Sequence, residues 1–171
     1  MNITPKVLEK AKKIKLVLTD CDGVLTDTGT YYSHEGEVMK RFSIRDGMGV
    51  ERLRNLVNVE TGIITGENTG IVSSRAAKLQ ITEVHLGIKN KTEKLNEILT
   101  RKNLKNDEIA FIGDDTNDIE IMKIVGLSAC PSDATKFAKE VANIVVENKG
   151  GYGAFRDFAE LIIEAKSKNK F

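Results

Sequence analysis

The stretch IKLVLTDCDGVLT, residues 14–26, places two carboxylates, Asp20 and Asp22, directly after a short apolar run. The apolar and β-branched residues predict a buried strand, along which successive side chains alternate. Asp20 and Asp22 are therefore expected to point the same way if the extended backbone persists to Asp22. Gly23 then allows a sharp turn without a Cβ penalty. Two carboxylates held side by side repel each other, so the stretch predicts a bound cation, a division of acid and base roles, or both.

Length and composition restrict the class of protein. The chain has 171 residues and a formal net charge of +1. This size predicts one domain over residues 1–171, and the balanced charge offers no field for nucleic acid or an anionic membrane. No apolar run approaches the roughly 20 residues of a membrane span. Two cysteines cannot build a disulfide framework, so we expect a soluble cytoplasmic protein with reduced thiols.

Apolar, β-branched runs alternate with helical periodicity along most of the chain. This alternation predicts an α/β fold, a doubly wound parallel sheet covered by helices on both faces. We expect strands at Ile14–Thr19, Val59–Thr65, Glu83–Leu86, Ile109–Ile112, Leu127–Ala129 and Asn143–Val146. We expect helices near Gly47–Leu56, Asn68–Leu79, Lys91–Lys102, Asp118–Ile124, Thr135–Glu140 and Ala154–Lys168, and a lead-in helix within Met1–Lys13.

One segment, residues 28–43, interrupts the alternation. Its Tyr31, Tyr32, Val38 and Met39 flank a polar turn and predict a β-hairpin inserted after the first strand. The hairpin follows the acidic stretch directly, so we expect it beside the strand ends. Two roles are compatible with this segment: an edge hairpin without a function, or a flap or subunit contact that partly closes the site. The apolar content is too small to decide between them.

Residues that follow the other strands complete a chemically related set. The carboxyl ends of parallel strands share one edge of the sheet, where ligands bind. Thr65 ends Val59–Thr65, Lys91 opens the helix after the next strand, and GDDTND, residues 113–118, follows Ile109–Ile112. An acidic pair, a hydroxyl, a lysine and a second acidic cluster together predict phosphoryl transfer to an aspartate.

The charges predict a role for each group. Mg²⁺ between Asp20 and the later acidic cluster would neutralise the carboxylates and bind phosphate oxygens. Asp20 is then the nucleophile, and Asp22 protonates the leaving alkoxide and later deprotonates water. Lys91 and the Thr65 hydroxyl would hold the phosphoryl oxygens. Each group alone is explained as well by a helix cap, a turn or a solvated lysine, but their ordered appearance at successive strand ends favours catalysis.

In these motifs the chain resembles the haloacid dehalogenase superfamily of phosphatases. It is most similar to the cap-less branch that contains 3-deoxy-D-manno-octulosonate 8-phosphate phosphatase and the nononate 9-phosphate phosphatases. The resemblance covers about residues 14–163 and implies a Rossmann-like fold with a hairpin insertion and no cap domain. The implied catalytic residues are Asp20, Asp22, Thr65 and Lys91. The implied Mg²⁺ ligands are Asp20, Asp22 through its backbone carbonyl, and Asp114, while Asp118 would orient Lys91.

The resemblance also implies a substrate and an assembly. The substrate would be a phosphate ester of a 2-keto-3-deoxy sugar acid, either nononate or sialate 9-phosphate or octulosonate 8-phosphate. The implied substrate-binding residues are Asp22, Ser43, Ile44, Arg45, Asp46, Gly47, Glu67, Arg75, Lys78 and Lys91. Glu67 stands where the octulosonate branch commonly has arginine, and its pairing with Lys78 resembles the nononate branch, although an ordinary surface ion pair explains it too. A homotetramer built around the hairpins is also implied.

Two other function classes are considered. A phospho-accepting receiver domain also gathers acidic residues, a threonine and a lysine on a parallel sheet. It carries its acidic pair on the first strand, however, and accepts the phosphate on a later one. A non-catalytic oligomerisation module of a sialic-acid-activating system would keep the fold without the chemistry. The Asp-x-Asp-Gly pattern and the complete set of acidic and lysine residues favour the phosphatase.

Overall fold

A central parallel sheet organises the computed structural model, which describes residues 3–167. Within this range six strands lie in the order β5-β4-β1-β6-β7-β8. They are β1 (Leu16–Thr19), β4 (Glu60–Ile64), β5 (Glu83–His85), β6 (Ile109–Ile112), β7 (Leu127–Cys130) and β8 (Ile144–Val145). Each predicted strand is confirmed, and the ends differ by no more than two residues.

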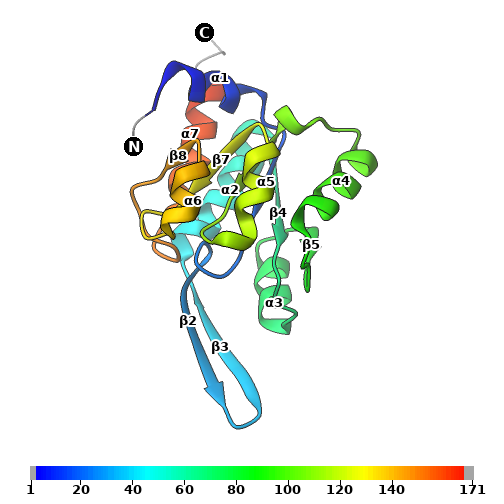
Figure 1. Ribbon diagram of the computed structural model, residues 1–171, viewed down its shortest axis with the longest axis vertical. Helices are drawn as coiled ribbons and strands as arrows, with labels where there is room; N and C mark the ends of the chain where they lie inside the picture. The colour runs from blue at the N-terminus through cyan, green and yellow to red at the C-terminus, as the bar shows by residue number, and fades with distance from the viewer. Residues whose placement is uncertain (1–2, 168–171) are drawn as a thin grey trace.

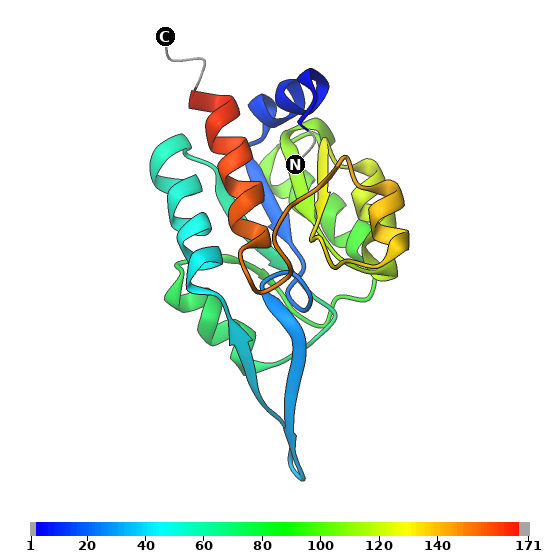
Figure 2. The same cartoon turned by 90° about the vertical axis from the view of Figure 1, so that its left-hand side faces the viewer.

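Helices cover both faces of this sheet (Figures 1 and 2). One face carries α1 (Pro5–Lys13), α2 (Ile44–Val57), α3 (Gly70–Lys78) and α7 (Ala154–Ser167). The other carries α4 (Lys91–Lys102), α5 (Ile119–Ile124) and α6 (Lys136–Val141), with short 3₁₀ turns at Asn106–Glu108 and Thr116–Asp118. The predicted α/β fold is confirmed; the parts of the predicted terminal helices at residues 1–2 and 168 lie outside the described residues.

Strand β1 shows why the sheet needs two helical layers. All four of its residues are buried. Val17 packs in the cluster that contains Phe155 and Phe158 of α7, whereas Leu16 and Leu18 pack in the cluster that contains Leu95 of α4. Because side chains alternate along a strand, an apolar strand of this kind is stable only between two covered faces.

Helix α4 has its ends defined by asparagines, and this sets the position of Lys91. The Asn90 side chain accepts a hydrogen bond from the Glu93 backbone N–H, and Asn103 ends the helix with φ of 52°. Asparagine suits both positions because its short amide caps N–H groups and tolerates the left-handed conformation. Lys91 therefore occupies the first position of the helix, at the edge of the sheet where the strands end.

The hairpin β2 (Thr26–Ser33) and β3 (Gly36–Phe42) projects away from the body of the molecule (Figure 1). Its pairing is irregular near the base, where the step from Thr26 to Thr30 on β2 faces the shorter step from Phe42 to Lys40 on β3. Thr28 lies in this irregularity with φ of 65°, an uncommon conformation for a β-branched residue. The predicted hairpin is thus confirmed, with a bulge beside the strand ends, where bulges commonly re-aim side chains.

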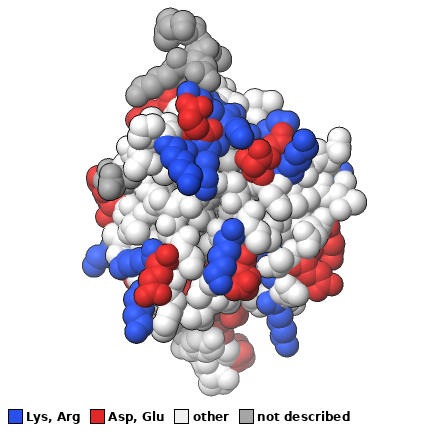
Figure 3. Space-filling view, turned by 45° about the horizontal axis from the view of Figure 1, so that its top comes forward, with Lys and Arg blue, Asp and Glu red and all other residues white. Residues whose placement is uncertain are grey.

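On the face that Figure 3 presents, basic and acidic side chains are interspersed. This distribution agrees with the net charge of +1. Among residues 3–167, no helix is long and apolar enough to cross a bilayer.

Candidate active site

The site lies at the carboxyl end of β1. At this strand the order in which the chain adds strands to the sheet reverses its direction. From β1 the chain reaches β4 and then β5 on one side, and it later crosses to β6 on the other. Such switch points leave a crevice beyond the strand ends in open α/β sheets. The Asp20 N–H donates to the Ile112 carbonyl at 3.0 Å, so the ends of β1 and β6 are held together.

Asp20 is the centre of a buried charge cluster. The Lys91 ammonium donates to Asp20 Oδ1 at 2.7 Å and to Asp118 Oδ1 at 2.6 Å, and its side chain is only 2% exposed. Burial raises the pKa of Asp20, while the Lys91 charge opposes this shift. Burial alone would lower the pKa of Lys91, but the Asp20 and Asp118 charges outweigh it and raise that pKa. The three groups therefore form one interdependent unit.

Two glycines make room for the second acidic segment. A Cβ on Gly23, which has φ of 88°, would lie 2.1 Å from an Asp114 carboxylate oxygen. A Cβ on Gly113 would lie 2.4 Å from Asp118 Cγ. Asp118 Oδ2 accepts the backbone N–H of Asp114 at 2.9 Å, which orients the segment. The positive φ at Gly23 and the close approach at both positions require glycine.

An open hollow of ≈ 250 Å³ lies over this cluster. Its lining residues are Asp20, Asp22, Thr28, Thr65, Gly66, Glu67, Asp114, Asp115 and Asn117. Burial and the charges of neighbouring carboxylates, Asp20 first among them, raise the pKa of Asp114 to about 8. Lys91 is not part of the lining, because it lies buried beneath Asp20. The hollow is therefore strongly acidic, and its volume is large enough for part of a small molecule.

This acidic floor fits a divalent cation. Carboxylate oxygens of Asp20, Asp114 and Asp118 lie within 4.8 Å of one another. The Asp22 carbonyl oxygen accepts no backbone hydrogen bond in the described part of the chain, so it remains a free acceptor. Hard cations such as Mg²⁺ prefer such oxygen donors and relieve carboxylate repulsion. Asp118 already accepts from Lys91 and backbone N–H groups, which leaves Asp20, Asp114 and the Asp22 carbonyl as the best candidates.

The extended backbone ends at Thr19, so the condition under which Asp20 and Asp22 would point the same way is not met. A turn follows, with the N–H of Leu25 donating to the Cys21 carbonyl at 2.9 Å. Asp22 Oδ1 instead accepts from the Thr26 hydroxyl at 3.0 Å, and Oδ2 accepts from the Lys40 ammonium at 2.6 Å. The Asp22 side chain is thus held from the hairpin, and the cluster of acidic oxygens forms between Asp20 and the residues after β6.

Lys40 was not among the residues that sequence patterns select. Its side chain is 1% exposed, and Lys40 is the one buried residue of β3. Burial alone would lower its pKa, but the hydrogen bond and charge of Asp22, together with Glu37, raise that pKa. Lys40 and Arg41 are adjacent basic residues in the same predicted hairpin, so no pattern marks Lys40 as the one that reaches the site.

The predicted substrate residues do not all lie at one place in the structure. Glu67 lines the acidic hollow, whereas Ser43, Ile44 and Arg45 line a separate hollow with Gly151 and Tyr152. Asp46 is buried and accepts backbone N–H groups of Gly153 and Arg156. Gly47 and Arg75 lie together behind this segment, where Arg75 donates to the Ser43 carbonyl at 2.8 Å. Lys78 is exposed near the end of α3 and forms no ion pair with Glu67 in the described chain.

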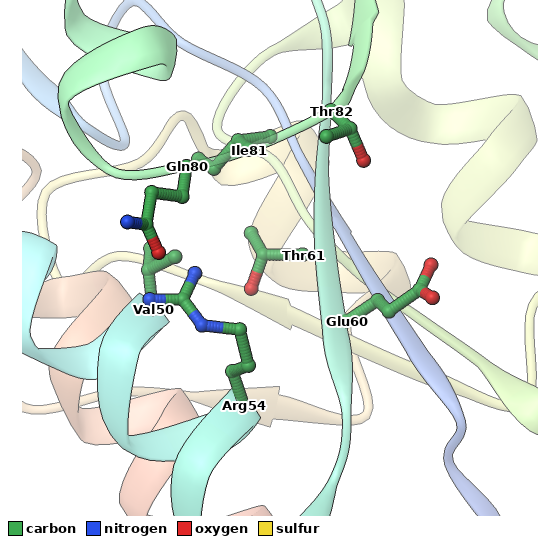
Figure 4. A pocket seen from close by; sticks show the side chains of 7 residues that line it. All are labelled: Val50, Arg54, Glu60, Thr61, Gln80, Ile81 and Thr82. Carbon is green, nitrogen blue, oxygen red and sulfur yellow. The ribbon is translucent and has the colours of Figure 1, made fainter.

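A second hollow of ≈ 160 Å³ lies at the opposite end of β4 (Figure 4). Arg54, Thr61 and Gln80 point toward one another there, while Glu60 lies on the other side of the strand. The Thr61 hydroxyl is buried without a partner, and Arg54 donates to the Leu79 carbonyl at 3.0 Å. No carboxylate pair converges in this hollow, so the chemistry of the strand ends is absent from it.

Comparison with known proteins agrees with this geometry. Residues 50–153 match the family of haloacid dehalogenase-like hydrolases. Over 97% of its length the chain is 36% identical to 3-deoxy-D-manno-octulosonate 8-phosphate phosphatase of Salmonella typhimurium, 88% of which is covered. The chain belongs to the haloacid dehalogenase-like hydrolase family. It is a phosphatase, and this removes the receiver domain and the non-catalytic module as alternatives.

Two solved structures place this haloacid dehalogenase phosphatase in the cap-less branch. The octulosonate 8-phosphate phosphatase of Yersinia pestis is 34% identical, with a TM-score of 0.92 over 97% of this chain and 89% of that one. The enzyme of the same name from Moraxella catarrhalis is 30% identical, with a TM-score of 0.93 over 97% and 95%. That structure is a complex with magnesium, phosphate and KDO. The resemblance in the motifs is therefore confirmed over nearly the whole chain.

Proposed function

We propose that this phosphatase removes the terminal phosphate of 3-deoxy-D-manno-octulosonate 8-phosphate in a Mg²⁺-dependent reaction. The observation that carries the chemistry is the Asp20 carboxylate, held by Lys91 at 2.7 Å on the floor of an acidic hollow. The names of the similar proteins support the substrate class. Bound Mg²⁺ would supply positive charge for the phosphoryl oxygens, with Asp20, Asp114 and the Asp22 carbonyl as its ligands.

The residues divide the reaction into two transfers. In the first, an Asp20 oxygen forms a bond to phosphorus while the bond from phosphorus to the sugar oxygen breaks. The sugar oxygen keeps the electron pair of that bond and takes a proton from Asp22. In the second, water gives a proton to Asp22 and its oxygen attacks phosphorus. The bond to Asp20 then breaks with its electron pair returning to the carboxylate, and inorganic phosphate leaves.

Lys91 and Thr65 support these transfers by position. Lys91 holds one oxygen of Asp20, which leaves the other for attack. Thr65 is buried at the end of β4, and its hydroxyl oxygen accepts the Glu67 N–H at 3.2 Å. Its hydroxyl proton is therefore available to a phosphoryl oxygen in the hollow that Thr65 lines.

Glu67 supports a nine-carbon substrate as the second candidate. Its position on the wall of the hollow puts a carboxylate where the octulosonate branch commonly has a cation. The similar proteins that carry a substrate in their names favour octulosonate 8-phosphate. Nononate 9-phosphate and sialate 9-phosphate remain the competing substrates, since a changed charge beside a sugar acid alters which ester binds best.

A phosphate-release panel tests the substrate. Octulosonate 8-phosphate, nononate 9-phosphate and sialate 9-phosphate are compared by kcat/KM, and we expect the first to be preferred by at least about tenfold. Glu67→Arg should increase that preference, and Lys123→Met, which removes an exposed charge that is not part of the hollow's lining, should not. Preference for a nine-carbon ester would refute the octulosonate proposal. An unchanged ratio in Glu67→Arg would remove Glu67 from the specificity argument.

The hairpin supports a homotetramer as part of the proposal. Tyr31, Tyr32, Val38 and Met39 are between 52% and 71% exposed on a projecting segment. A cluster of exposed apolar side chains of this kind commonly marks a surface that binds another protein chain. Light scattering should give four times the mass of one chain, and Tyr32→Ser with Met39→Ser should lower it. A monomeric wild-type protein would contradict the assembly.

A further inference from the structure

The side chain of Asp22 is held from the hairpin rather than from the sheet. Its Oδ2 accepts from Lys40 at 2.6 Å and its Oδ1 from Thr26 at 3.0 Å. Both donors belong to the hairpin strands, Lys40 to β3 and Thr26 to the first position of β2. No other side chain in the described chain donates to the Asp22 carboxylate. The position of the proposed acid and base therefore depends on the base of the hairpin.

The Lys40 side chain is buried and is held in place by two carboxylates. Its side chain is 1% exposed, and its ammonium also lies 3.3 Å from Glu37 Oε2. The other Glu37 oxygen is buried without a partner, so Glu37 is neutralised through Lys40 alone among the described residues. The Lys40 ammonium is itself buried between these two carboxylates, so moving it from this place would leave a buried charge without its partners. Lys40 consequently fixes the Asp22 oxygens.

The burial of Lys40 separates it from substrate. It does not line the hollow over Asp20, and the lining residue that it contacts is Asp22. The bulge between Thr26 and Thr30 lies at the same level, since Thr30 is the register partner of Lys40. Irregular pairing beside a site commonly re-aims a side chain toward it.

We propose that Lys40 is a positioning residue that holds the Asp22 carboxylate in place for proton transfer to the leaving sugar oxygen. This inference rests on the proposed role of Asp22. If Lys40 acts in this way, the effect of removing it on the reaction rate should depend on the leaving group of the phosphate ester. A sugar alkoxide is a poor leaving group and needs the proton, whereas 4-nitrophenolate leaves as a stable anion. Loss of Lys40 should therefore slow phosphoryl transfer from the sugar ester selectively.

The test compares Lys40→Met with wild type on octulosonate 8-phosphate and on 4-nitrophenyl phosphate. The quantity measured is kcat/KM, which covers the steps up to the first irreversible transfer. We expect a fall of roughly 100-fold for the sugar ester and of less than about fivefold for the aryl ester. The KM for the sugar ester should change little, because Lys40 does not touch substrate. Lys40→Gln keeps a donor beside Asp22 and should show the same selectivity with a smaller loss.

A matched control removes another lysine that bridges two carboxylates. Lys102 lies 2.5 Å from Glu60 Oε2 and 3.5 Å from Glu83 Oε2, away from the acidic hollow. Lys102→Met should leave the ratio of the two kcat/KM values unchanged. Equal losses on both esters in folded Lys40 variants, or no loss on the sugar ester, would overturn the proposal. Lys40→Gln decides the outcome if Lys40→Met does not fold.

Asp22→Asn separates this proposal from the role on which it rests. If Asp22→Asn also loses the sugar ester selectively, Asp22 is the acid, and the result for Lys40 stands on its own. If Asp22→Asn is selective while the Lys40 variants are not, only the positioning role fails. If Asp22→Asn lowers both esters equally, or neither, the proposed acid role fails and the Lys40 proposal fails with it.

Discussion

Replacing Asp20 with Asn is expected to abolish phosphatase turnover without unfolding the protein. The amide has no anionic oxygen to attack phosphorus, and loss of a nucleophile costs roughly 10⁴-fold or more in kcat. Asn keeps an oxygen that accepts from Lys91, and the variant buries one fewer negative charge beside Asp118. Phosphate release and thermal unfolding, measured together, check both parts of the expectation.

Two further measurements make the role of Asp20 specific. Wild-type protein quenched in acid during turnover should gain the mass of one phosphoryl group, and Asp20→Asn should not. Asp107→Asn makes the same charge change at an exposed residue that pairs with Lys13, so its turnover should equal that of wild type. A folded Asp20→Asn protein with more than about a tenth of wild-type activity would contradict nucleophilic catalysis by Asp20.

Replacing Lys91 with Met is expected to damage stability as well as activity. Lys91 neutralises Asp20 and Asp118, both of which are buried, at 2.7 and 2.6 Å. Removing one partner of a buried ion pair leaves an uncompensated charge and costs about 3–5 kcal/mol. Chemical denaturation in metal-free buffer measures this loss. Lys123→Met, which removes an exposed lysine paired with Glu120, should unfold close to wild type.

The loss in Lys91→Met should grow as the pH rises. The pKa of Asp114 is about 8 in the folded protein against an ordinary value of 3.8. A carboxyl with a raised folded-state pKa contributes stability that is full below the unfolded value and is lost as pH rises through the folded value. The Lys91 charge lowers the pKa of both Asp20 and Asp114, so its removal steepens that loss. A destabilisation that shrinks between about pH 6 and pH 8.5 would refute this account.

Prediction of the fold from sequence succeeded where local signals are strong. Strand Ile109–Ile112 and helix Lys91–Lys102 have their predicted ends, because β6 is a short apolar run and α4 has Asn90 and Asn103 at its limits. The first strand begins at Leu16 rather than at Ile14, since Ile14 serves as the C-cap of α1. Strand order could not be read from periodicity, which reports burial but not which strands pair.

The structure brings together those predicted site residues that are attached directly to strand ends. Asp20, Thr65 and Asp114 line one hollow because parallel strands bring their carboxyl ends to one edge. Asp22 lies on the same hollow, but its side chain turns toward the hairpin. Lys40 was missed because its approach depends on hairpin pairing and a bulge, neither of which has a signature in the residues themselves.

The DCDG motif, together with a lysine and a second acidic cluster at later strand ends, was enough to predict phosphoryl transfer to an aspartate. The prediction is possible from sequence because the carboxyl ends of parallel strands meet at one edge of the sheet. The tertiary structure decides which carboxylates lie together in the charge cluster. The turn after Thr19 sends Asp22 to Lys40, and the crossing from β1 to β6 brings Asp114 and Asp118 to Asp20. These contacts join residues far apart in the chain, so packing rather than local pattern selects them.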